Sequence, residues 1–158
     1  MLFEDFAKNQ KDVVAALRQM SAAATAPFLE KQSLEKDLVE LLKIRVSQIN
    51  GCAFCLQFHL NLARKLGVDE RKLGLVAAWR DAGGFSEREC VAFDYAERLT
   101  LLGHNHFTSA DRPVDGKPFS GSEIEQLTIA IATINAWNRI AAALHFPPPL
   151  SPPLSPQV

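Results

Sequence analysis

The chain has 158 residues, of which 47% are hydrophobic and 22% are charged, a composition typical of a single globular domain with a core of its own. The formal net charge of -1 gives no electrostatic reason to expect nucleic acid or an acidic membrane surface as a partner. Apolar stretches are too short to span a bilayer, and the N-terminus carries Glu4 and Asp5 where an export signal has basic residues. We therefore expect a cytoplasmic protein.

The first two predicted helices are separated by a proline. Apolar residues at helical spacing predict the first helix over residues 3–24, and Pro27 ends that region. The second helix is expected to start after a Ser33 N-cap. The turn dipeptide Asn50-Gly51 ends it.

The next two predicted helices follow directly. The third begins at the cysteine pair Cys52 and Cys55 and stops at Gly67. Asp69 is a suitable N-cap for the fourth, which should run to Trp79.

Capping boxes mark the last two predicted helices. Ser86 and Glu89 form the first box, before a helix that should reach Leu102. After a polar loop, Ser122 and Glu125 form the second box, and the last helix is expected to reach His145.

No segment shows the alternating pattern of a strand, so the sequence predicts an all-α fold. We expect one domain of about six helices over residues 1–146. Residues 147–158 are rich in Pro and Ser and should form an extended tail.

The cysteines carry most of the functional information. The chain has three cysteines, and this odd number argues against a secreted disulfide scaffold. Cys90 lies in a separate, apolar helical pattern and is interpreted as a packing residue. In a cytosolic protein, the pair Cys52 and Cys55 indicates redox or metal chemistry.

Two cysteines three residues apart on a helix are neighbours, at roughly 5–6 Å between their Cβ atoms. That separation is close to what a disulfide needs. The helix start favours a thiolate, which can attack a peroxide to give a sulfenic acid that the second cysteine resolves. The helix dipole by itself favours Cys52 as the ionised thiol, because Cys52 lies nearer the helix start.

His59 follows Cys55 by four residues and Cys52 by seven, which places the three side chains on one helix face. An imidazole there can take or return a thiol proton. Glu40 lies on the preceding helix, and a simple hairpin turning at Gly51 would carry it past the cysteines.

Other readings of these residues stay open. The cysteines and His59 could bind zinc with His104 or His106, although no second CxxC motif exists. Taken singly, His59 could be a half-buried helix residue and Glu40 a solvated charge. The residues expected to pack in the core or at a subunit interface are Trp79, Trp137, Asn135 and Arg139.

The pattern Glu-x11-Cys-x2-Cys-x3-His, formed by Glu40, Cys52, Cys55 and His59, resembles the signature of alkylhydroperoxidase D-like (AhpD-like) proteins. These proteins belong to the carboxymuconolactone decarboxylase superfamily. The approach to the cysteines is similar too, as are the helices around residues 77–100 and 134–139, so that the likeness covers about residues 30–146.

The resemblance implies an all-helical homo-oligomer, as a dimer, trimer or hexamer, that reduces hydroperoxides. It implies that Cys55 attacks the peroxide, that Cys52 resolves the intermediate, and that Glu40 and His59 relay protons. Phe54 stands where the best-studied branch has a histidine, which makes the site more apolar. The decarboxylase branch lacks the cysteine pair, so its presence here argues against lactone decarboxylation.

The sequence thus predicts a peroxidase acting on a small-molecule hydroperoxide, reset by an external dithiol or protein reductant, with no bound cofactor. One alternative is a thiol–disulfide oxidoreductase or redox sensor. Another is a helical oligomeric binding module whose cysteines hold zinc. Oligomerisation is also expected because the segment 124–144 offers more apolar surface than a small bundle buries.

Overall fold

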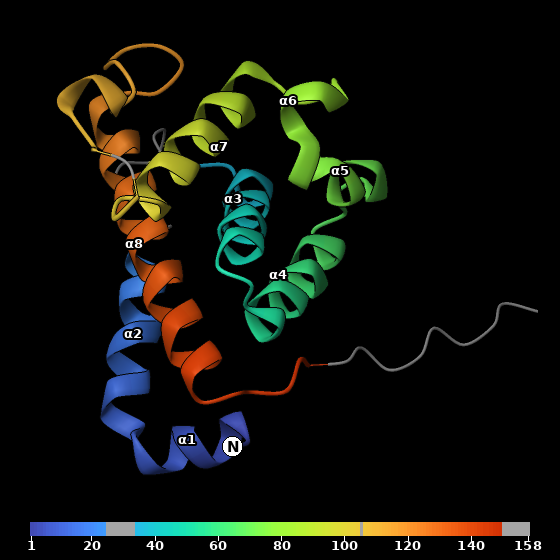
Figure 1. Ribbon diagram of the computed structural model, residues 1–158, viewed down its shortest axis with the longest axis vertical. Helices are drawn as coiled ribbons and strands as arrows, with labels where there is room; N and C mark the ends of the chain where they lie inside the picture. The colour runs from blue at the N-terminus through green and yellow to red at the C-terminus, as the bar shows by residue number, and fades with distance from the viewer. Residues whose placement is uncertain (25–33, 105, 150–158) are drawn as a thin grey trace, which may run out of the picture.

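The computed structural model describes residues 1–24, 34–104 and 106–149, and within these ranges the fold is all-α without strands, as predicted (Figure 1). The helices run in the order α1 (Phe3–Asn9), α2 (Lys11–Ala23), α3 (Lys36–Ile49), α4 (Ala53–Lys65), α5 (Glu70–Leu75), α6 (Trp79–Ala82), α7 (Glu87–Thr100) and α8 (Gly121–Ala143), with short 3-10 turns η1 (Val76–Ala78) and η2 (Ser109–Asp111).

Two of the expected helices are each divided. Gln10 leaves the helical region at φ -122° and ψ 43°, which separates α1 from α2. The break turns α1 so that Phe6 reaches Phe146 near the C-terminal end of α8. The expected fourth helix is likewise interrupted by η1 between α5 and α6.

One predicted capping box is confirmed and the other is wrong. Ser86 and Glu89 form the expected reciprocal capping box of α7. The N-cap of α8 is Ser120 rather than Ser122, with Glu123 as its reciprocal partner. A hydrophobic staple explains the choice, because Phe119 just before the cap and Ile124 in the first turn are both buried in the same core.

Of the other predicted boundaries, one is confirmed and two lie wholly or partly outside the described residues. Asp69 caps α5 as expected, accepting a hydrogen bond from the Arg71 backbone. The expected N-cap Ser33 lies outside the described residues, and α3 begins at Lys36. Of the predicted tail, only residues 147–149 are described, so its extended form stays a prediction.

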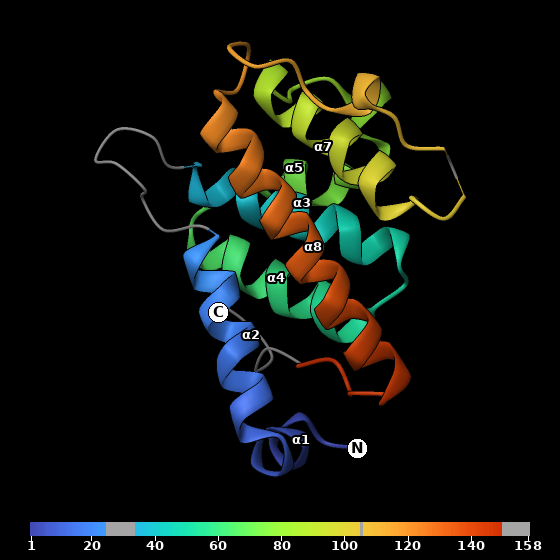
Figure 2. The same cartoon turned by 90° about the vertical axis from the view of Figure 1, so that its left-hand side faces the viewer.

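Helix α3 occupies the centre of the molecule and packs against α4, α7 and α8 (Figures 1 and 2). More than half of its residues are buried. Helix α8 crosses in front of α3 in Figure 2, with α2 beside it. The turn between α3 and α4 therefore lies close to α8, where both cysteines join the main core.

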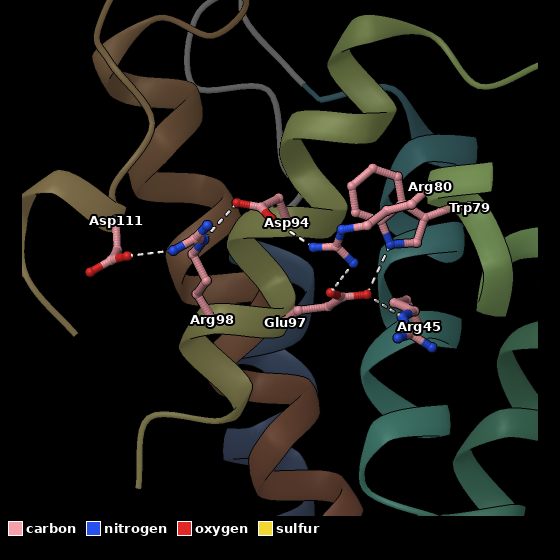
Figure 3. Close-up of polar contacts among 7 residues, drawn as sticks. All are labelled: Arg45, Trp79, Arg80, Asp94, Glu97, Arg98 and Asp111. Atoms are coloured by element: carbon pink, nitrogen blue, oxygen red, sulfur yellow. Dashed lines mark hydrogen bonds and ion pairs between the residues drawn. The ribbon is translucent and has the colours of Figure 1, made fainter. Parts of the chain in front are cut away.

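The Glu97 carboxylate on α7 connects this helix to α3 and α6 (Figure 3). Glu97 accepts hydrogen bonds from Arg45 of α3 at 2.7 Å, from the Trp79 indole at 2.8 Å and from Arg80 of α6. The surface ion pairs continue through Asp94, Arg98 and Asp111. The structural role expected for Trp79 is confirmed.

None of the helices in the described ranges combines the length and apolar character needed to cross a bilayer.

Candidate active site

The cysteine pair lies at the start of α4, directly after the turn that joins it to α3. Gly51 adopts φ +64°, a conformation that glycine tolerates without strain, and this reverses the chain. The Cys52 backbone N–H donates to the Ser47 carbonyl at 3.0 Å. Cys52 is the N-cap of α4, and its Sγ accepts the Cys55 backbone N–H at 3.3 Å. The helix start thus supplies a donor to the first sulfur.

The two thiols are buried, at 2% exposure for Cys52 and 3% for Cys55, and they are hydrogen-bonded to each other. The Cys55 thiol as donor lowers the pKa of Cys52 to about 7, although burial opposes this. The same hydrogen bond, together with burial, raises the pKa of Cys55. The pair therefore loses the first of its two protons near neutral pH, and the negative charge then lies chiefly on Cys52.

This sharing predicts the titration of the reduced protein. As the pH is raised, the ultraviolet absorbance of thiolate should show the ionisation of one thiol per chain with a midpoint near pH 7. Cys52→Ser should abolish that step. Because the folded pKa lies below the unfolded value, the free energy of unfolding should increase with pH between the two pKa values. Chemical denaturation across that range checks the sign. A midpoint near the ordinary thiol value would contradict the arrangement.

His59 lies two turns along α4 and faces Glu40 of α3. Its Nδ1 is 2.7 Å from Glu40 Oε2, while Lys43 Nζ is 3.0 Å from Glu40 Oε1. Because α3 and α4 form a hairpin, Glu40 lies beyond the cysteines, as expected. It is level with His59 and contacts the imidazole.

The protonation of this pair follows from its surroundings. Burial raises the pKa of the Glu40 carboxyl, but the hydrogen bonds and charges of His59 and Lys43 outweigh it and lower the pKa below its ordinary value. Burial lowers the pKa of His59, and Glu40 only partly offsets this. A carboxylate can only accept, so Nδ1 carries the proton of the neutral ring and Nε2 is left as an acceptor.

A cavity of about 410 Å³ adjoins the site. Cys55 and His59 are in its wall, whereas Cys52 is not among the lining residues. The apolar part of the wall includes Phe3, Phe54, Phe58, Leu62, Ile134 and Trp137. Of the two sulfurs, Cys55 is the one that a small molecule in this cavity meets.

The structure thus brings Glu40, Cys52, Cys55 and His59 together. It also adds cavity residues that the sequence analysis left aside. Phe3 comes from α1, and no sequence signal connects it with Phe54, although the two ring centroids are 5.5 Å apart. Trp137 packs against the core as expected and lines the cavity as well.

The zinc alternative has no ligand set in the part of the chain that is described, where no group of three or more His, Cys, Asp and Glu residues is arranged to hold a metal. His104 and His106 are exposed, as expected from their polar loop. Cys90 is half-buried and packs against a hydrophobic cluster that includes Trp79 and Phe93, separate from the cluster that contains the cysteine pair.

Comparison with known proteins assigns the family. The sequence matches the carboxymuconolactone decarboxylase family over residues 11–98, which include α3, the cysteine turn and α4. The chain belongs to this family. Among curated relatives, the uncharacterized protein YdfG of Bacillus subtilis is 32% identical over 117 residues, covering 74% of this chain and 80% of YdfG. The uncharacterized protein YnjA of Escherichia coli is 28% identical over 123 residues, covering 76% of this chain and 66% of YnjA.

A solved structure places this family member with the AhpD-like proteins of the superfamily. The Agrobacterium tumefaciens protein ATU0492, of unknown function and described as a candidate antioxidant defence protein AhpD, has a TM-score of 0.82 and 28% identity. The likeness covers 92% of this chain and 97% of ATU0492. The predicted AhpD-like fold is therefore confirmed.

Proposed function

We propose that this protein is a thiol peroxidase that reduces organic hydroperoxides by oxidising Cys52 and Cys55 to a disulfide. The observation that supports this most directly is the position of Cys55. Its thiol lies in the wall of an apolar cavity, hydrogen-bonded to Cys52 behind it and near the His59–Glu40 pair.

The attacking sulfur is proposed to be Cys55. The lower pKa belongs to Cys52, but Cys52 does not line the cavity. Access decides between them, because the coupled thiols exchange one proton and a buried thiolate without a substrate beside it cannot react.

The proposed reaction starts with a Cys52 thiolate, a Cys55 thiol, a neutral His59 and a charged Glu40. The Cys55 proton passes to Cys52, so that the negative charge moves to Cys55. The Cys55 thiolate attacks the terminal peroxide oxygen and the O–O bond breaks. His59 Nε2 accepts the proton now on Cys52, directly or through water, and the imidazolium, stabilised by Glu40, gives it to the alkoxide to form ROH, which leaves Cys52 as a thiolate again. The Cys52 thiolate then attacks the Cys55 sulfenic acid, which forms the disulfide and releases hydroxide.

The cavity supports an organic substrate. A volume of about 410 Å³ lined mainly by aromatic and aliphatic side chains suits an apolar R group, whose transfer from water favours binding. Hydrogen peroxide gains nothing from such a wall. An external dithiol would then reduce the disulfide and complete the cycle.

Stopped-flow oxidation of the reduced protein tests the proposal. We expect fast, saturable formation of one intramolecular disulfide with cumene hydroperoxide, and about tenfold or more lower efficiency with hydrogen peroxide because the apolar contacts are missing. Mass spectrometry should place the disulfide between Cys52 and Cys55. Oxidation of both sulfurs at the rate of free cysteine would contradict the proposal and favour a thiol–disulfide exchange role.

A matched pair of variants, one on α4 and one at its C-cap, tests the cavity. Phe58 and Leu66 have similar exposure, at 44% and 47%, but only Phe58 lines the cavity. Phe58→Ala should reduce the preference for cumene hydroperoxide, whereas Leu66→Ala should leave it unchanged. Equal effects of the two substitutions would mean that the organic group binds elsewhere.

A further inference from the structure

Asn138 of α8 is a buried polar side chain behind the cysteine pair. It is 1% exposed, and its Nδ2 donates to Ser47 Oγ at 3.1 Å. The Ser47 carbonyl in turn accepts the Cys52 backbone N–H at 3.0 Å, so the amide lies beside the cysteine turn. The Asn138 side chain lowers the pKa of both Cys52 and Cys55. The question is whether the amide presents a donor or an acceptor to the sulfurs, because only a donor stabilises a thiolate.

The surrounding hydrogen bonds determine which way this amide faces. The guanidinium of Arg139 can only donate, and it bonds Asn135 Oδ1 at 2.9 Å. The Ile131 carbonyl can only accept, and it receives Asn135 Nδ2 at 3.0 Å. The orientation of Asn135 is thereby fixed, with its oxygen toward Asn50.

Asn50 links the orientation of the Asn135 amide to that of Asn138. Its Nδ2 donates to Asn135 Oδ1 at 2.9 Å and to Asn138 Oδ1 at 2.8 Å. A reversed Asn138 amide would set two NH2 groups against each other. The Asn138 oxygen therefore faces Asn50, and its NH2 group faces Ser47, on the side of the cysteine turn.

We propose that Asn138 is a further catalytic residue, a directionally fixed amide donor that stabilises negative charge on whichever sulfur of the pair is ionised. The proposal rests on the redox role of the pair proposed above, but not on peroxide being its oxidant. The donor lowers the pKa of both thiols, so it favours each thiolate in turn as charge passes from Cys52 to Cys55.

The donor also biases the redox equilibrium. It interacts more strongly with a thiolate than with the uncharged sulfurs of a disulfide, so it stabilises the reduced form. A disulfide whose reduced form is stabilised is a stronger oxidant and is reduced more readily by a dithiol. Asn138 should therefore ease the resetting of the enzyme as well as the attack.

Two substitutions test this without any peroxide. Asn138→Leu removes the donor, and Asn138→Asp keeps the shape and the Asn50 contact while replacing the donor with an acceptor. In both variants we expect the acid dissociation constant of the pair to fall about tenfold, so that the midpoint of the thiolate titration rises by about one pH unit. The ratio of reduced to oxidised protein in a dithiol buffer should also fall about tenfold.

Thr128→Val is the control, because Thr128 lies on the same helix and bonds Tyr95 and the Ile124 carbonyl instead of the sulfurs. It should leave the titration and the redox equilibrium unchanged. If Asn138→Leu does not fold, the near-isosteric Asn138→Asp decides. A folded variant with lower stability but an unchanged midpoint would show that Asn138 only packs, whatever the outcome with peroxides.

Discussion

Cys55→Ser is expected to slow oxidation by cumene hydroperoxide by roughly 10³-fold or more, since it removes the nucleophile in the cavity wall. The Cys52→Ser variant should still carry out the attack of Cys55 on the peroxide, but the reaction should stop at that point. Without the resolving sulfur, a sulfenic acid should accumulate at Cys55 and react with a dimedone probe. Rapid-mixing kinetics and mass spectrometry of the labelled peptide distinguish the two variants.

Cys90→Ser is the matched control for both, because Cys90 is a thiol on α7 outside the cavity that contains Cys55. Its oxidation rate should equal that of the native protein. If dimedone instead labels Cys52 in the Cys55→Ser variant at the native rate, the order of attack is reversed. The thiolate with the lower pKa would then be the nucleophile, as the helix dipole alone suggests.

Glu40→Gln is expected to lower the oxidation rate by about 10²-fold, at the lower end of what general acid–base catalysis contributes. The amide oxygen can still accept the His59 Nδ1 proton, so the ring should keep its place. The negative charge that stabilises the imidazolium is lost, and the pKa of His59 should fall further. The measurements are the pH dependence of the oxidation rate and the NMR titration of the His59 ring.

The control for this substitution is Glu125→Gln, at an exposed position in the first part of α8. It changes the net charge equally and should leave the rate unaffected. A Glu40→Gln variant with native kinetics would remove the carboxylate from the mechanism. It would leave Glu40 as a partner of Lys43 that stabilises the α3–α4 pair.

Local signals in the sequence were sufficient for the fold class and most helix boundaries. The absence of alternating strands, the cap at Asp69 and the box at Ser86 each depend on neighbouring residues, and each is confirmed. The start of α8 was assigned to the wrong serine because both serines precede a glutamate by three residues. Burial of Phe119 against Ile124, which local spacing does not reveal, selects Ser120.

The division of the first helix has the same kind of cause. Residues 3–23 have a helical pattern throughout, yet the chain breaks at Gln10. Phe3 and Phe6 of α1 then meet Phe146, more than a hundred residues along the chain. A gain from tertiary packing outweighs the local helix preference here.

By itself, the sequence determined that two cysteines and a histidine share the start of one helix, because their spacing fixes their relative positions on a helical face. Only the tertiary structure decided that Glu40 bonds His59, that Cys55 rather than Cys52 lines the cavity, and that Asn138 turns its amide donor toward Ser47 beside the cysteine turn. These relations join helices distant in sequence, and they depend on how α3, α4 and α8 pack, which no local spacing encodes.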